Sequence, residues 1–308
     1  MAELAGRVAC FAVPAEEFVE IEYRLELKRR GELEFLGGKA ELVRLGHMDD
    51  VHMAMLVHAA AATPGPKLAY GSTNNGFVAK MIRFKGRASH AGARPDKGIN
   101  ALNAMALAIM NINAQRETFR DDDTIRVHQI VTRGGDLVNI VPDDVRMEMF
   151  VRGKTVEAIL DANAKVTRAL EAAGMAVGGS VEIENVPGYL PRLKEAALTN
   201  LLAENFGALI GKEHLEEEGH GTGSSDTGDL SHLMPMAEVK AGGFHGYMHT
   251  SSHMVADEDL AYIVPAKAMA MTAVDSLADG ARVARETLAA FKPKMTKAEY
   301  LAFLRSFR

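Results

Sequence analysis

The stretch GFVAKMIRFKG (residues 76–86) begins the part of the chain that decides the fold. It is a mostly apolar run that ends on a glycine, which predicts a strand. The segments that follow predict a helix at 99–115, strands at 124–132 and 144–152, a helix at 155–174 and a strand at 180–188. This βαββαβ order is the ferredoxin-like pattern, a four-stranded antiparallel sheet with two helices on one face. We place this domain at residues 72–190.

The residues on either side have a different pattern, with short apolar runs and helices. RVACFAV (7–13) reads as a short buried strand, and we expect a long helix at 264–290 and a short one at 296–306. The middle domain therefore interrupts a second domain, formed by residues 1–71 and 191–308. We predict the α/β class, with a partial mixed sheet in this second domain.

Composition limits the partners of this chain. Its 308 residues are 47% hydrophobic and 25% charged, and the formal net charge is −6. This charge gives no basic field for nucleic acid or an anionic membrane, so we expect a small-molecule partner. No apolar run approaches the roughly 18 residues of a membrane-spanning helix. The single cysteine, Cys10, has apolar neighbours and predicts a buried thiol in a reducing compartment, the cytoplasm.

Two adjacent carboxylates, Glu16 and Glu17, follow the predicted strand at 7–13. Ligands of open α/β sheets collect at the carboxyl ends of strands. Adjacent residues there point in different directions, so one carboxylate can bind a metal while the other accepts a proton from metal-bound water. Glu16 is then the natural general base. The alternative is a surface pair of acids at a turn.

Two histidines could complete a metal site with Glu17. His58 ends the apolar run MAMLVH, and His249 lies in GYMHTSSH, where His245 and His253 compete with it. Zinc and related ions favour imidazole nitrogen and carboxylate oxygen, so the three groups together make a plausible transition-metal set. Each histidine taken alone is a weaker candidate.

The middle domain offers three polar candidates. His90 lies in a loop between a strand and a helix, where it can donate a hydrogen bond outward or merely cap the helix. Asn139 lies at a turn and Arg152 at a strand end, and an amide and a guanidinium suit a carbonyl or carboxylate. The alternative for Arg152 is a solvated strand end.

GHGTGSSDTGDLSH (219–232) is rich in glycine and small polar residues. It predicts a loop whose backbone approaches a ligand, not a packed element. It lacks the Gly-Lys-Ser/Thr ending of a P-loop. Ser224 or Ser225 as a nucleophile has little support, because there is no nucleophile-elbow pattern.

Taken in order, VPAEE, SHAGARPDKGINAL, VNIVPDD, GSSDTGDLSH and HTSSHMVADEDL resemble the M20 family of metallopeptidases and amidohydrolases. The likeness is greatest to its aminoacylase-like and aminobenzoyl-glutamate hydrolase-like branch. It implies a catalytic domain interrupted by a lid and dimerisation domain, a homodimer, and hydrolysis of an N-acyl or aminoacyl amino acid. It also implies a divalent metal, Zn²⁺ first and Mn²⁺ or Co²⁺ as alternatives.

The resemblance assigns a role to each candidate residue. Glu16 is the general base, and the imidazole of His90 reaches across a dimer to polarise the scissile carbonyl of the neighbouring subunit. The implied metal ligands are Glu17, His58 and His249, and the implied substrate contacts are Asn139, Arg152 and Asp226.

One departure from the family pattern affects the metal. Members carry two further ligands, in His-x-Asp or Cys-Gly-His motifs upstream of PAEE, and this chain begins at the PAEE strand. His47 and Asp49 spell His-x-Asp but lie after it. We expect weakened two-metal binding, with three ligands left for one loosely held ion, and a chain shortened at its start.

Two functions are therefore open. The first is metal-dependent hydrolysis of an amide bond. The second is a non-catalytic member of the same fold that dimerises or binds a ligand, because its metal site is incomplete.

Overall fold

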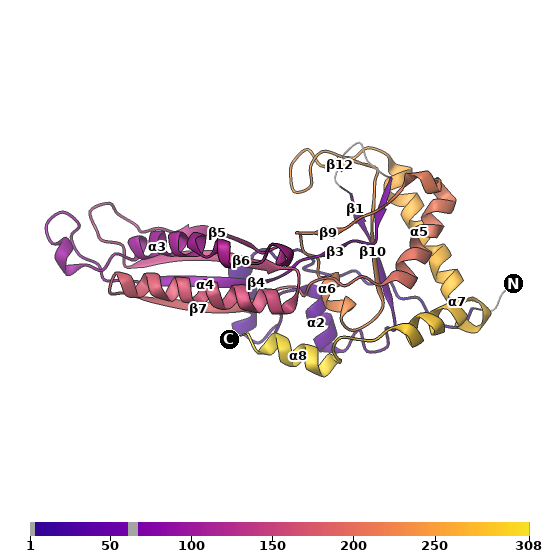
Figure 1. The fold of residues 1–308 in the computed structure, drawn as a ribbon, viewed down its shortest axis with the longest axis horizontal. Coiled ribbons are helices and arrows are strands. Elements are labelled where there is room, and N and C mark those ends of the chain that lie inside the picture. The colour runs from indigo at the N-terminus through magenta and orange to yellow at the C-terminus, as the bar shows by residue number, and fades with distance from the viewer. Residues whose placement is uncertain (1–3, 61–66, 308) are drawn as a thin grey trace. The chain divides into compact units, whose positions relative to one another are not determined.

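The computed structural model describes residues 4–60 and 67–307, and the chain forms two compact units (Figure 1). Unit 1 consists of the segment that ends at Asn74, Arg192–Gly221 and Ser225–Glu299. Unit 2 consists of Asn75–Pro191, Thr222–Ser224 and the segment that begins at Tyr300. The chain thus leaves unit 1 once to build most of unit 2 and then returns.

Unit 2 is built on a four-stranded antiparallel sheet with the strand order β5-β6-β4-β7. Helices α3 and α4 cover one face of it (Figure 1). The helices and strands are β4 Gly76–Lys85, α3 Ala101–Ala114, β5 Arg126–Arg133, β6 Asp144–Gly153, α4 Val156–Ala176 and β7 Ser180–Pro187.

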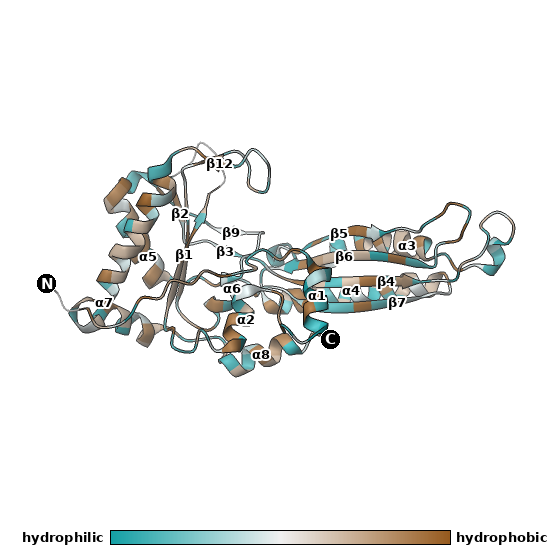
Figure 2. Ribbon diagram, turned by 180° about the vertical axis from the view of Figure 1, so that it is seen from behind, coloured by the Kyte–Doolittle hydropathy of each residue, from teal (hydrophilic) through white to brown (hydrophobic). Residues whose placement is uncertain are grey.

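Buried and half-buried residues alternate along the strands, so one face of this sheet points to the core and the other to solvent. In β6 every second residue from Val145 to Gly153 is buried, and the residues between them are half-buried. Figure 2 shows the corresponding change of hydropathy along β4 and β6. The helices begin at side-chain caps, with Asn100 accepting from two backbone N–H groups of α3 and Thr155 from one of α4. The core between sheet and helices includes Phe84, Met147 and Leu170.

The end of the chain packs on unit 2. In helix α8 (Lys297–Arg305) the side chain of Tyr300 is fully buried. Phe303 and Phe307, whose rings meet edge to face at 5.2 Å, line a small hollow together with Phe77 and Ile159. Residues from Tyr300 onward therefore contribute to unit 2.

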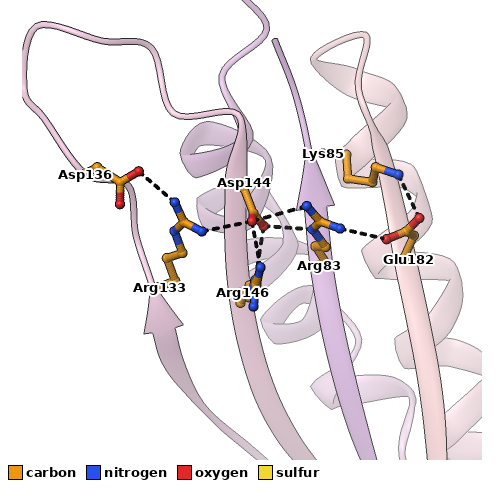
Figure 3. Close-up of polar contacts among 7 residues, drawn as sticks. All are labelled: Arg83, Lys85, Arg133, Asp136, Asp144, Arg146 and Glu182. Carbon is orange, nitrogen blue, oxygen red and sulfur yellow. Dashed lines mark hydrogen bonds and ion pairs between the residues drawn. The ribbon is translucent and has the colours of Figure 1, made fainter. Parts of the chain in front are cut away.

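The open face of the sheet carries an ion-pair network around Asp144, at the start of β6 (Figure 3). Its carboxylate accepts hydrogen bonds from Arg146 at 2.9 Å, Arg83 at 2.9 Å and Arg133 at 3.1 Å, and its side chain is 13% exposed. The hydrogen bonds from Arg146 and Arg83 and the charges of both residues outweigh burial, and they lower the pKa of Asp144 to about 2.

We expect Asp144→Asn to lower the free energy of unfolding at neutral pH by about 1–2 kcal/mol. A carboxyl group whose pKa is lower in the folded than in the unfolded state stabilises the fold above about pH 4, and this contribution disappears as the pH falls through about 2. Urea unfolding should therefore show a wild-type advantage that shrinks over that range. Asp136→Asn is the matched control, because Asp136 bonds Arg133 but is 70% exposed. An advantage that did not change with pH would contradict the assignment.

Unit 1 contains a mixed four-stranded sheet with the order β1-β10-β2-β8. β1 runs parallel to β10, β10 antiparallel to β2, and β2 parallel to β8. The elements are α1 Ile21–Arg29, α2 Gly38–Leu45, β1 Ala54–Ala59, β2 Leu68–Tyr70, β3 Thr73–Asn74, α5 Ala196–Ile210, β8 Leu215–Glu217, β9 His220–Gly221, α6 Thr227–Ser231, β10 Met236–Ala241, β11 Phe244–His245, β12 Met254–Val255 and α7 Val264–Ala290.

The core of unit 1 forms where α5 and α7 pack on this sheet. It includes Leu202 and Phe206 of α5, Val239 of β10 and Ala268 of α7. The predicted mixed α/β class is confirmed. Helix α7 is interrupted at 278–281, where three consecutive residues around Gly280 have positive φ, so the expected long helix is in fact two. No helix in the described part of the chain is long and apolar enough to cross a membrane.

Two predictions near the start of the chain are wrong. Residues 7–13 do not form a strand, and Val8 and Phe11 are exposed. Cys10 is exposed as well, so its thiol is not buried. A short apolar run becomes a strand only when a neighbouring strand supplies ladder hydrogen bonds, and no described strand pairs with these residues.

Candidate functional site

The PAEE segment forms a tight turn that precedes α1. Ala15 has a positive φ of 56°, and its carbonyl accepts a hydrogen bond of 3.1 Å from the backbone of Gly38. The buried guanidinium of Arg24 donates to the carbonyl of Glu17 at 2.7 Å and to that of Leu36 at 3.2 Å. The two acids therefore lie on a turn held by α2 and Arg24, rather than at the end of a strand.

Gly38 is required for this turn. A Cβ at this position would lie 1.9 Å from the carbonyl oxygen of Pro14 and 2.9 Å from the side chain of Val13. We expect Gly38→Ala to displace the turn and lower the free energy of unfolding by about 1–3 kcal/mol, measured in urea. Gly219→Ala is the control, because a Cβ there meets no atom within 4 Å. Equal stability of the two variants would show that the turn adapts freely.

The structure places two of the three predicted metal ligands close to each other. His249 Nδ1 lies 3.9 Å from Glu17 Oε1, and both side chains are exposed. His58, in β1, has its Nδ1 atom 2.7 Å from the carbonyl oxygen of Ala59. The competing His253 stacks on Phe244 at 5.3 Å.

The donor types of Glu17, His58 and His249 suit zinc and related ions. Within residues 4–60 and 67–307, however, no group of three or more His, Cys, Asp or Glu side chains converges in a way that could hold an ion. Among the described residues, Glu17, His58 and His249 therefore match such an ion in donor chemistry but do not converge on one point.

Asp226 lies in a buried charge cluster of unit 1. Its carboxylate is fully buried, and Oδ1 lies 2.5 Å from the ammonium of Lys39, which is itself 5% exposed. Burial raises the pKa of Asp226 to about 6; the Lys39 ammonium lowers it, and the charges of Glu16 and Glu238 raise it further. A substrate cannot reach this carboxylate in the described structure, so direct contact with substrate is not what its position favours.

The glycine-rich stretch at 219–232 is more ordered than predicted. It contains β9 and α6, and Ser225, Thr227 and Asp229 are buried. The expectation of an unpacked loop is therefore wrong for its second half. The hydroxyl of Ser225 donates at 3.0 Å to Glu238, and that of Thr227 donates to the same oxygen. These hydroxyls replace solvent for a buried carboxylate, which is why small polar residues recur here.

Sequence reasoning missed the partner of that carboxylate. Arg192, 4% exposed, forms an ion pair with Glu238 on the central strand β10. Its Nη2 donates to Ser72 at 2.7 Å, and its backbone N–H donates to the carbonyl and the side chain of Asn74, each at 3.2 Å. Burial raises the pKa of Glu238, but the charge and hydrogen bond of Arg192, together with the hydroxyl of Thr227 and the charge of His58, lower it overall. A lone arginine after the apolar PGYLP segment was the available signal.

In unit 2 the structure brings His90 and Asn139 together. The backbone N–H of Ala91 donates to the carbonyl of Asn139 at 2.9 Å, and His90 pairs with Ile140 in an isolated bridge. His90 Nδ1 accepts from the backbone N–H groups of the residues two and three positions further on, at 3.2 and 3.1 Å. The ring proton is then on Nε2, where the exposed imidazole can donate outward. Asn100, not His90, caps α3.

Arg152 lies near the other end of β6. Its guanidinium lies over the rings of Phe77 and Phe150, with centroids at 5.1 and 5.3 Å, and donates to Ser224 Oγ at 2.7 Å and His128 Nε2 at 3.1 Å. Burial lowers its pKa, although an arginine stays charged. Arg152 is therefore not the solvated strand end that was the alternative.

The two ends of β6 are far apart. Asn139 lies five residues before the strand begins at Asp144, and Arg152 lies near its end. A strand rises about 3.3 Å per residue, so the eight steps along β6 separate Asp144 from Arg152 by about 26 Å. The backbone hydrogen bonds from Gly86 to Asp143 and from Val141 to Ser89 continue the pairing beyond Asp144, away from Arg152. Within one chain, therefore, His90 and Asn139 cannot contact the same small molecule as Arg152.

Comparisons with known proteins show which proteins the chain resembles. Residues 73–176 match the family model described as "Peptidase dimerisation domain". Over 78% of its length the chain is 28% identical to the Xaa-Arg dipeptidase of Mus musculus, covering 56% of that protein. Over 38% of its length it is 32% identical to one of the subunits of the p-aminobenzoyl-glutamate hydrolase of Escherichia coli K12, covering 26% of it. The chain thus spans about half or less of the length of these two relatives.

Among solved structures, the chain resembles the Bacillus subtilis YXEP protein, which is described as a dinuclear metal-binding peptidase of the M20 family. The TM-score is 0.56 at 19% identity, over 83% of this chain and 69% of that one. The fold is that of a two-unit α/β protein, and the relatives it resembles are named as hydrolases of amide bonds. The chain therefore resembles the M20 family, including its aminobenzoyl-glutamate hydrolases.

Proposed function

We propose that this chain acts in a metal-dependent hydrolase that cleaves the amide bond of an N-acyl or aminoacyl amino acid. The relatives with which it aligns are named for hydrolysis of such bonds. The observation that carries the proposal is the placement of His90 and Asn139 at one end of β6 and Arg152 at the other. This placement suits a site completed by a second copy, in which one copy supplies His90 and Asn139 and the other supplies Arg152.

Each residue has a defined task in this proposal. Arg152 binds the substrate carboxylate with its charged N–H groups, and Asn139 of the second copy bonds a substrate polar group. His90 of that copy donates from Nε2 to the scissile carbonyl, where negative charge develops. Glu16 moves the proton. A divalent ion, with zinc as the first choice and manganese or cobalt next, would acidify water and polarise the carbonyl, with Glu17, His58 and His249 as its proposed ligands.

The outer edge of β5 suits such a dimer. In the sheet β5 is paired by β6 on one side only, and its residues Ile130 and Val131 are 62% and 44% exposed. An unpaired strand edge with apolar side chains is a template for a second strand. Antiparallel pairing of β5 with its own copy would bring the His90 end of one sheet toward the Arg152 end of the other.

Complementation tests the shared site. We expect His90→Ala and Arg152→Ala each to abolish amide hydrolysis, and a mixture of the two unfolded and refolded together to regain activity, because mixed dimers contain one intact site. The measurement is hydrolysis of N-acyl amino acids by the variants alone and mixed, with the Asp136→Asn variant mixed with each as control. Without recovery in refolded mixed dimers, the two residues act within one chain or not at all.

A second function is favoured by one observation. Because the described residues bring no three metal-ligating side chains together, the chain fits a non-catalytic, dimerising or ligand-binding protein of the same fold. Metal stoichiometry separates this alternative from the hydrolase.

A further inference from the structure

The guanidinium of Arg152 contacts four side chains, namely two aromatic rings, an imidazole and a hydroxyl. Phe77 and Phe150 support it from one side, their rings 4.7 Å apart, and Tyr189 meets Phe77 edge to face at 5.0 Å. Cation–π contacts of this kind set the plane of the guanidinium. A hydrogen-bond partner is still required to prevent the guanidinium from rotating within that plane.

His128, in the edge strand β5, supplies that partner. Its Nε2 accepts from Arg152 Nε at 3.1 Å, and its ring meets Phe150 edge to face at 5.6 Å. Because Nε2 accepts, the ring is neutral with its proton on Nδ1. Burial, and then the charge of Arg152, lower the pKa of His128, so the acceptor form prevails at neutral pH.

This contact decides which edge of Arg152 remains for a ligand. A carboxylate can bind a guanidinium side-on, through Nε and one terminal nitrogen, or end-on, through both terminal nitrogens. His128 occupies Nε, so the side-on edge is closed. Ser224 accepts a hydrogen bond from one N–H of Nη1 at 2.7 Å, and within the described part of the chain the other three N–H groups of the terminal nitrogens have no protein partner.

We propose that His128 is a positioning residue, which fixes Arg152 so that a substrate carboxylate can bind only at its end-on edge. The proposal rests on the proposed role of Arg152 in binding the substrate carboxylate. It adds a specificity element: ligands whose carboxylate approaches along the end-on direction are accepted, and those that require Nε are not. Protonation of His128 removes the acceptor and places a second positive charge beside Arg152, so the restraint ends in acid.

Other charged groups contribute to the pH at which this happens. On β6 they are Arg152 and Glu148, which lies two residues from Phe150 on the same face. On β5 the nearest is Arg126, which lies opposite Arg152 in the ladder. β4 contributes the uncharged Phe77 to the cluster. The pH at which His128 is protonated therefore depends on these charges together, and the titration of its ring signals gives it.

Nuclear magnetic resonance of the Arg152 Nε–H group tests the proposal in the whole protein. In the wild type we expect a protected signal that moves in one step together with the His128 ring signals as the pH falls. His128→Phe keeps the ring contact but removes the acceptor, so the protected signal should be lost. His128→Gln keeps an acceptor, so the signal should persist without the pH step. Asp136→Asn, which removes an exposed carboxylate outside this cluster, is the control and should change neither.

The result that would overturn the proposal is a wild-type Arg152 signal that ignores the titration of His128, or one unchanged in His128→Phe. Should the Phe variant fail to fold, the wild-type titration and the Gln variant still decide. Titration with N-acetylglycine separates this inference from the proposed function. We expect about tenfold weaker binding in His128→Phe and near wild-type binding in His128→Gln. If N-acetylglycine does not shift Arg152 even in the wild type, the substrate role of Arg152 fails, and the positioning inference fails with it only if the Nε–H coupling is absent as well.

Discussion

Arg192→Met should lower the free energy of unfolding by about 3–5 kcal/mol, the largest effect on stability that we expect of one substitution in this chain. The change removes the counter-ion of Glu238 and leaves that carboxylate buried, with only the hydroxyls of Ser225 and Thr227 as partners among the contacts described. An uncompensated buried charge is far more costly than an exposed one. Urea unfolding measures the loss.

The pH dependence of that loss identifies its cause. Without Arg192 the remaining burial raises the pKa of Glu238 above its unfolded-state value, so the variant is penalised above about pH 5 and relieved below it. Adding Glu238→Gln to Arg192→Met should recover part of the stability, because the amide carries no charge. Lys194→Met is the matched control: it breaks an ion pair with Glu217 in which the side chains are 46% and 54% exposed, and should cost less than about 1 kcal/mol. A loss as small as that of the control would show that the buried pair is not needed.

Glu16→Gln should lower the rate of amide hydrolysis by about 10²–10⁴-fold. The amide cannot accept the proton that the general base removes, whereas Glu17 and the histidines stay in place, so metal content should be unchanged. Glu22→Gln, an exposed acid on α1, is the control and should keep full activity. Turnover retained in Glu16→Gln would exclude Glu16 as the base.

Metal uptake and amide hydrolysis by the unaltered chain decide between the hydrolase and the non-catalytic alternative. A chain that takes up less than about 0.2 equivalents of zinc, manganese or cobalt, and hydrolyses no amide, is the non-catalytic alternative. A chain that binds metal and hydrolyses an N-acyl amino acid supports the hydrolase. Metal binding without hydrolysis would show that the metal ligands are in place and that the general base or the residues from the second copy are not.

The elements of unit 2 could be predicted from the sequence because their signals are local. The apolar period of β4 and β6, the cap at Asn100 and the cap at Thr155 each occupy a few neighbouring residues. The order of the motifs along the chain likewise indicated the resemblance to the M20 family. The run at 7–13 shows where such signals fail, because its hydropathy is that of a strand but a strand also needs a paired neighbour.

The sequence by itself therefore determined the α/β class, the elements of the middle unit and the resemblance to the M20 family. The tertiary structure alone decided that Lys39 pairs with Asp226, 187 residues away, and that Arg192 neutralises Glu238. It also decided that His90 and Asn139 lie at the far end of β6 from Arg152. The physical reason is that periodicity and caps act within a few residues, whereas the free energy of a buried charge depends on whichever distant side chain the fold places beside it.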